Sequence, residues 1–232
     1  MTQTVLYDRK ANPDYIPRVA AVHDLCGYGK CSLGIAIPVV SAGGCDVCPV
    51  PTGLFSSHTA FPGWYMHDTT DILPDYLAAW QNIGVEIDAI YSGFLGAPEQ
   101  VDIIRSLYER YPKALRVVDP VMADHGKVYP TYTPELCAAM ADLACDADIL
   151  TPNLTEAAII LGEEWHGTDI SDDEAKRIID ALIEKGAKNV VLKGVQREGE
   201  SVIRNFAAGV DIDFFEASNE YLSLIHISEP TR

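Results

Sequence analysis

Basic residues are scarce in this sequence of 232 residues: 17 Lys and Arg stand against 34 Asp and Glu, a formal net charge of −17. Nucleic acid is therefore not an expected partner, because phosphate backbones are bound by basic surfaces. The sequence also lacks an apolar run long enough to cross a bilayer and a secretory-type apolar segment. We therefore expect a cytoplasmic protein with no membrane partner.

The spacing typical of zinc or redox cysteines occurs once, at Cys45 and Cys48. No second C-x-x-C and no histidine pair accompanies it. The two cysteines also fall in a predicted strand, where residues three apart point to opposite faces. We therefore expect Cys45 and Cys48 to be buried, reduced thiols rather than a zinc or redox site.

The sequence does contain a regular alternation of short apolar strands and amphipathic helices, which predicts one α/β domain. Residues 1–17 have no sustained periodicity and are expected to form a mobile or loosely docked arm. The expected strands are Arg18–Val22, Asp46–Val50, Ala89–Tyr91, Leu115–Val118, Asp148–Leu150 and Asn189–Leu192, followed by a hairpin of Ser201–Phe206 and Asp211–Glu216. Helices are expected between them, ending near Ala42, over Thr70–Ile83, after Pro98, after Thr133, over Ala157–Leu161 and from Ser171 to Gly186.

Two of these strands end in polar residues. Asp119-Pro120 stops the strand Leu115–Val118, and Asp124 follows on a loop in which Gly126 supplies flexibility. Thr151–Glu156 follows the strand that ends at Leu150, and it leads into a helix. Open α/β sheets bind ligands at the carboxyl ends of their strands, and these residue types suit a nucleotide phosphate and its metal. Either passage alone is explained equally well as a turn.

Together, Asp119–Asp124 and Thr151–Glu156 resemble the DPVMGD and TPNxxE signatures of the ribokinase-like superfamily, in its vitamin-kinase branch. Phe55–Phe61 and Tyr91–Gly96 are similar to segments of pyridoxal and pyridoxamine kinases, and the resemblance extends from about Arg18 to about Ser223. It implies a three-layer α/β fold over residues 18–223, with a mainly parallel sheet and helices on both faces. It also implies a homodimer and transfer of the ATP γ-phosphoryl group to the 5′-hydroxymethyl of a B6 vitamer, with Mg²⁺ and a monovalent cation such as K⁺.

The resemblance also implies roles for individual residues. Asp119, Asn153, Glu156 and Lys193 would bind ATP, and Asp119 and Glu156 would hold the metal, with Asp124 as a weaker candidate. For Lys193 the alternative is a solvated surface charge, although an acidic chain needs a local cation beside phosphates.

The vitamin would bind at a glycine-containing loop that follows the first strand, near Asp24. Asp24 stands where a Walker A loop needs glycine and Cys31 where it needs Ser or Thr, so this loop is not a Walker A loop. Thr52, at the end of the second strand, would also hold the pyridine ring. His58 is expected to form a local hydrogen bond in its turn rather than to contact the substrate.

The resemblance breaks near the end of the sequence. Related kinases take their general base and anion hole from a Gly-x-Gly-Asp loop, and that motif occurs nowhere in the 232 residues. The catalytic residue is therefore unknown, the kinase domain is expected to be incomplete at its C-terminal part, and residues 224–232 are interpreted as a non-native tail. We expect the chain as written to be inactive. The alternatives are a hydroxymethylpyrimidine kinase of the same superfamily and a non-catalytic vitamin- or nucleotide-binding protein.

Overall fold

The computed structural model describes residues 14–210 and 212–220. Most of the expected N-terminal arm and the whole of the expected tail at 224–232 lie outside this part of the chain. Within the arm, the Tyr15 hydroxyl donates a hydrogen bond to the Asp88 carboxylate, so residues next to the first strand are docked on the domain. No helix of the described residues combines the length and the apolarity needed to cross a membrane.

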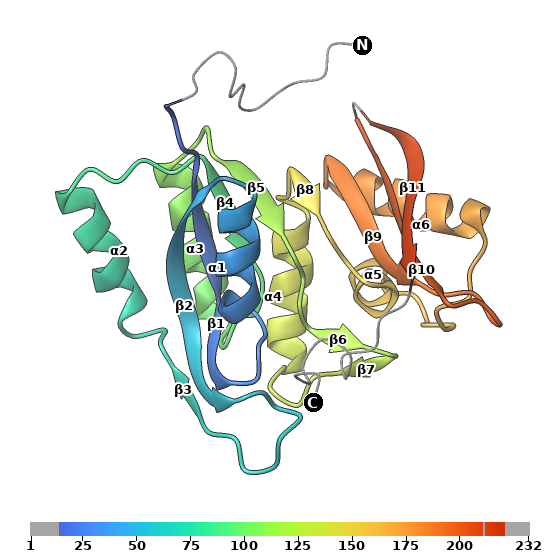
Figure 1. Ribbon diagram of the computed structural model, residues 1–232, viewed down its shortest axis with the longest axis horizontal. Coiled ribbons are helices and arrows are strands. Elements are labelled where there is room, and N and C mark those ends of the chain that lie inside the picture. The colour runs from blue at the N-terminus through green and yellow to red at the C-terminus, as the bar shows by residue number, and fades with distance from the viewer. Residues whose placement is uncertain (1–13, 211, 221–232) are drawn as a thin grey trace.

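The architecture is a nine-stranded mixed sheet in the order β11-β10-β9-β8-β5-β4-β1-β2-β3 (Figure 1). Pairing is parallel from β2 to β9 and antiparallel at both ends, where β3 pairs with β2 and β10 pairs with β9 and β11. The strands are β1 Arg18–Tyr28, β2 Asp46–Ser57, β3 Met66–Asp68, β4 Ala89–Ser92, β5 Leu115–Val118, β8 Ile149–Leu150, β9 Asn189–Val195, β10 Val202–Gly209 and β11 Ile212–Glu220; β6 Ala123–Asp124 and β7 Lys127–Val128 form a separate hairpin.

Helices cover both faces of the sheet, as expected, but unequally. The helix α1 packs on β1 and β2, whereas α3, α4, α5 and α6 contact one another in sequence. Right-handed crossovers explain this division, because the chain moves one way from β1 to β2 and the other way from β4 to β9. The helices are α1 Leu33–Ala42, α2 Leu73–Asn82, α3 Glu99–Arg110, α4 Pro134–Ala144, α5 Leu154–Leu161 and α6 Asp172–Glu184.

The core lies between the parallel strands and this row of helices. Strands covered on both faces have continuous apolar runs, and Ala20, Ile90 and Val118 at their centres have no exposed surface. The helices contribute one apolar face each, which contains Ile104, Leu107, Met140 and Ile179, all fully buried.

The strand β2 does not end at Pro51, as the sequence suggests, but continues to Ser57 beside an equally extended β1. The carbonyls of Pro49 and Pro51 accept hydrogen bonds from the hydroxyls of Tyr76 and Thr69. The backbone of both prolines therefore faces away from β1. Because no ladder bond to β1 is made at these positions, the missing proline N–H costs the sheet nothing. The strand β9 likewise continues past Lys193 to Val195, which pairs with β10.

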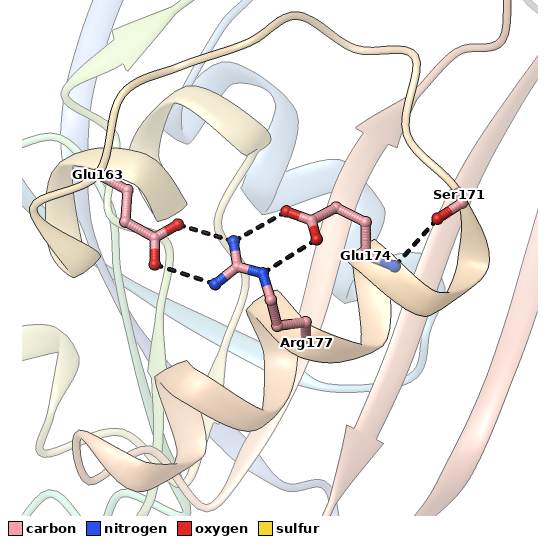
Figure 2. A network of polar contacts seen from close by, with 4 residues as sticks. All are labelled: Glu163, Ser171, Glu174 and Arg177. Atoms are coloured by element: carbon pink, nitrogen blue, oxygen red, sulfur yellow. Dashed lines mark hydrogen bonds and ion pairs between the residues drawn. The ribbon is translucent and has the colours of Figure 1, made fainter.

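The helix α6 begins with only half of the expected capping box. The Ser171 hydroxyl accepts a hydrogen bond of 3.2 Å from the Glu174 amide. The Glu174 carboxylate does not return to the cap but binds the Arg177 guanidinium, which also binds Glu163 in a bidentate pair (Figure 2). Arg177 thus links α6 to the segment that follows α5.

We expect Leu107→Ala in α3 to lower the free energy of unfolding by about 2–5 kcal/mol, because it removes a fully buried side chain and leaves a cavity. Arg177→Ala is the comparison and should cost less than about 1 kcal/mol, because its ion pairs are half-exposed. Urea unfolding of both variants measures the difference. Equal losses would mean that the surface ion pairs stabilise the fold as much as the core does.

Candidate functional site

The polar residues predicted at two strand ends meet at the carboxyl edge of the sheet. The Lys193 ammonium in β9 donates a hydrogen bond of 2.8 Å to the carboxylate of Asp119, which follows β5. The strand between them, β8, ends at Leu150, and Asn153 then forms an isolated parallel bridge with Lys193. Because β8 is short, side chains from the strands on either side of it reach each other across its end.

Asn153 and Glu156 form a complete capping box at the start of α5. The Asn153 backbone amide donates a hydrogen bond of 2.8 Å to the Glu156 carboxylate. The Glu156 backbone amide donates one of 2.9 Å to the Asn153 side-chain oxygen. The helix therefore begins at Leu154, three residues earlier than the sequence suggests. Two further hydrogen bonds fix the loop after β5. The Met122 backbone amide donates to the Glu156 carboxylate, and the Asn153 side-chain amide donates to the Ala123 carbonyl.

The electrostatic environment at this edge is acidic. Glu156 is only 2% exposed, and burial, with the nearby charge of Asp119, raises its pKa to about 8, against the opposing effect of Lys193. Burial also raises the pKa of Tyr129 to about 12, with contributions from Asp124, Glu156 and Asp119. The charges of these three acids thus reach the Tyr129 hydroxyl, and a cation bound in this region would offset their mutual repulsion.

Asp124 lies on an ordered hairpin, so the expected flexible loop is wrong. His125 and Gly126 form its turn with φ values of 48° and 74°, and the Gly126 amide donates a hydrogen bond of 3.0 Å to the Thr155 hydroxyl. A Cβ at Gly126 would lie 2.5 Å from the Trp165 ring, so glycine is needed here for space as well as for its conformation. The Asp124 carboxylate itself is half-exposed and accepts from the His125 amide.

A cavity of about 400 Å³ opens beside this edge, at the carboxyl ends of β1 and β2. Its walls combine aromatic, small and polar side chains, and Tyr129 lines the cavity while its hydroxyl feels the charges of the acids described above. The lining residues are Asp24, Cys26, Cys31, Ser32, Phe55, His58, Thr59, Ala60, Trp64, Phe94, Val121, Tyr129, Pro130 and Thr131.

The two residues predicted to hold a ring differ in their position. Asp24 lies in the cavity wall, 4% exposed, and burial raises the pKa of its carboxyl while hydrogen bonds from Ser32 and Cys26 lower it. Thr52 is completely buried behind the wall, where its hydroxyl donates a hydrogen bond of 2.6 Å to the Phe94 carbonyl. Thr52 therefore acts on the cavity through Phe94.

Other cavity residues were not expected from the sequence. His58 accepts a local hydrogen bond from the Ala60 amide, as expected, and also lines the cavity. The aromatic side chains of Phe55, Trp64 and Phe94 come from three segments and meet only in the folded chain. All six cysteines are free and half-buried, so Cys45 and Cys48 are less buried than expected.

The raised pKa of Glu156 makes stability depend on pH. The folded chain holds the Glu156 proton up to about pH 8, whereas the unfolded chain loses it near 4.5. The free energy of unfolding should therefore fall as pH rises through this window. Glu156→Gln keeps a carbonyl oxygen for the capping box but cannot ionise.

We expect the wild-type chain to lose stability relative to Glu156→Gln by an amount on the order of a few kcal/mol between pH 5 and pH 9. Urea unfolding at a series of pH values measures this difference. Parallel curves for the two proteins would show that Glu156 has an ordinary pKa.

Comparisons with known proteins agree with this architecture. The phosphomethylpyrimidine kinase family model matches residues 57–226. Pyridoxal kinase PdxY of Histophilus somni is 31% identical over 197 residues, which cover 81% of this chain and 63% of that protein. The chain thus spans less than two thirds of the length of this relative.

Two solved structures share the fold over 90% of the chain and 74% of their own length. One is a Bacteroides thetaiotaomicron protein described as a phosphomethylpyrimidine kinase and crystallised with pyridoxal, with 36% identity and a TM-score of 0.84. The other is pyridoxal kinase from Lactobacillus plantarum, with 29% identity and a TM-score of 0.78. The chain belongs to the phosphomethylpyrimidine kinase family, which includes pyridoxal kinases and has the ribokinase-like α/β fold.

Proposed function

We propose that this chain belongs to an ATP-dependent kinase that phosphorylates the 5′-hydroxymethyl group of pyridoxal, pyridoxamine or pyridoxine. The observation that carries the proposal is the adjacency of two sites. An aromatic cavity containing one buried carboxylate, Asp24, is joined through Tyr129 to the paired Asp119 and Lys193 at the ends of β5 and β9. A small ring and a phosphate donor bound there would lie side by side.

The cavity suits a vitamin ring. Phe55, Trp64 and Phe94 line the cavity and would offer apolar contact to a flat heteroaromatic ring, and Asp24 would accept a hydrogen bond from a ring N–H. The Bacteroides thetaiotaomicron relative, crystallised with pyridoxal, supports this choice of ligand. The proposed role of Thr52 is to hold the Phe94 backbone in place beneath the ring.

The strand ends suit the phosphates of ATP. Lys193 would move from Asp119 to a phosphate oxygen, and Asp119 would then be free to hold Mg²⁺. Both carboxyl oxygens of Glu156 accept backbone N–H groups, so Glu156 would act on the metal through water, and a bound cation would favour its ionised form over the protonated form that burial favours. Bound Mg²⁺ would neutralise developing charge on the transferring group. Asn153 would support the phosphates, and Asp124 is a more distant candidate for the metal environment.

The family match favours a second candidate, a hydroxymethylpyrimidine kinase, because the same cavity accepts another small hydroxymethyl heteroaromatic ring. Phosphorylation of a panel of B6 vitamers and hydroxymethylpyrimidine would separate the two. We also propose a homodimer, since among the described residues α1 packs on β1 and β2 but leaves Ile35 and Val39 exposed, and a second copy would cover them. Sedimentation velocity would test this assembly.

We expect Asp119→Asn to lower kcat by at least about tenfold, a barrier increase of about 1.4 kcal/mol, because it removes the proposed metal ligand and the partner of Lys193. Asp213→Asn on the exposed edge strand β11 is the matched control. Since the chain spans 63% of its relative, both changes are made in a chimera that adds the C-terminal segment of the Lactobacillus plantarum kinase to residues 1–223. Wild-type turnover of Asp119→Asn across a Mg²⁺ titration would refute the assignment.

Thr52→Val in the same chimera should raise KM for the vitamin about two- to tenfold and leave KM for ATP nearly unchanged, because one net hydrogen bond beneath the ring is lost. Thr52→Ser, which keeps the hydroxyl, should restore vitamin binding. An effect confined to ATP would place this residue at the other ligand.

A further inference from the structure

Two thiols and a carboxylate converge on one point in the cavity wall. The Cys31 thiol donates to the Cys26 sulfur at 2.9 Å, and the Cys26 thiol donates to the Asp24 carboxylate at 3.5 Å. One potential ligand atom from each of the three residues lies within 4.8 Å of the other two. All three residues line the cavity, so the cluster has access from solvent.

The extension of β1 past His23 builds this cluster. Asp24 and Cys26 are two apart in the strand, so their side chains point to the same side. Gly29 then turns the chain with φ 82° and returns Cys31 to them. A Cβ at Gly29 would lie 2.8 Å from the Cβ of His58, which shows how closely the turn packs against the end of β2.

We propose that Asp24, Cys26 and Cys31 form a binding site for a thiophilic divalent cation such as Zn²⁺, with a fourth position open to the cavity. Tetrahedral zinc with bonds of about 2.3 Å to sulfur and about 2.0 Å to oxygen needs a sulfur–oxygen separation of about 3.5 Å. The observed distance from the Cys26 Sγ to the Asp24 Oδ2 is 3.5 Å. The two sulfurs need to separate from 2.9 Å to about 3.8 Å, which side-chain rotation at Cys31 supplies.

Cation binding at this point is coupled to proton release. Binding releases the two thiol protons to solvent, forms two metal–sulfur bonds and one metal–oxygen bond, and displaces water from the ion. Without a cation, burial raises the pKa of both thiols and of the Asp24 carboxyl, so the protonated forms of all three groups are favoured. A divalent ion reverses that preference. Sulfur ligands select zinc-like ions over Mg²⁺, which takes oxygen.

A disulfide between the same cysteines is the competing use of the cluster. It requires loss of the thiol protons, as cation binding does, and in addition an external oxidant, which the chain itself does not supply. The cation site goes beyond the proposed kinase reaction and does not depend on it. It uses Asp24, however, so a bound cation and a ring held by Asp24 would exclude each other.

The experiment is a titration of the 232-residue chain with Co²⁺ in the presence of a phosphine reductant. We expect one Co²⁺ per chain, with thiolate-to-metal charge-transfer absorption, the visible bands of tetrahedral cobalt, and displacement by Zn²⁺. Cys31→Ser and Cys26→Ser should each weaken binding at least about a hundredfold, and Asp24→Asn at least about tenfold. Cys137→Ser in α4 is the matched control, because it removes a half-buried thiol outside the cluster, and its titration should equal that of the wild type.

Circular dichroism shows whether each variant is folded. Cys31 lies in a loop, so its substitution is expected to disturb the sheet least. Unchanged Co²⁺ affinity in folded Cys31→Ser, or absorption without charge-transfer bands, would overturn the proposal. So would a Cys26–Cys31 disulfide in the purified chain combined with no cation uptake after reduction. Equal affinity in Asp24→Asn would remove the carboxylate from the site.

Discussion

The parallel pairing of the central strands is the constraint on which the site depends. It places the carboxyl ends of β2, β1, β4, β5, β8 and β9 along one edge of the sheet. Asp24, Asp119, Asn153 and Lys193 come from separate parts of the chain and lie at that edge because of strand order. The shortness of β8 completes the arrangement, since it lets Lys193 reach past this strand to Asp119.

Several site residues also maintain the local structure, and this shapes their chemistry. Glu156 caps α5 and holds the loop after β5, so its carboxylate is buried by the same contacts that position it. Burial near Asp119 then creates an acidic region that a cation can stabilise. In a chain of net charge −17, the binding of an anionic nucleotide depends on such local cations. In the proposed site, Lys193 would supply one of them.

Much of the fold could be predicted from the alternation of strands and helices, and the two strand ends at Asp119 and Thr151–Glu156 were identified by their turn residues. The extension of β1 and β2 could not, because Pro51 is a local stop signal for a strand. Pro51 fits inside β2 because its backbone faces the side of β2 that is not paired with β1 at this position. Only the order of strands in the sheet shows which side that is. For the same reason no local pattern predicts that Cys31 meets Cys26 or that Thr52 lies behind Phe94.

The strand order also has a consequence for the path of folding. The strands β9, β10 and β11 form an antiparallel meander joined by short turns, so their contacts close small loops. The ion pair between Lys193 and Asp119 joins residues 74 positions apart. Contacts of such separation carry a larger entropic cost and form later. The edge that carries the ion pair is therefore expected to be assembled after the meander.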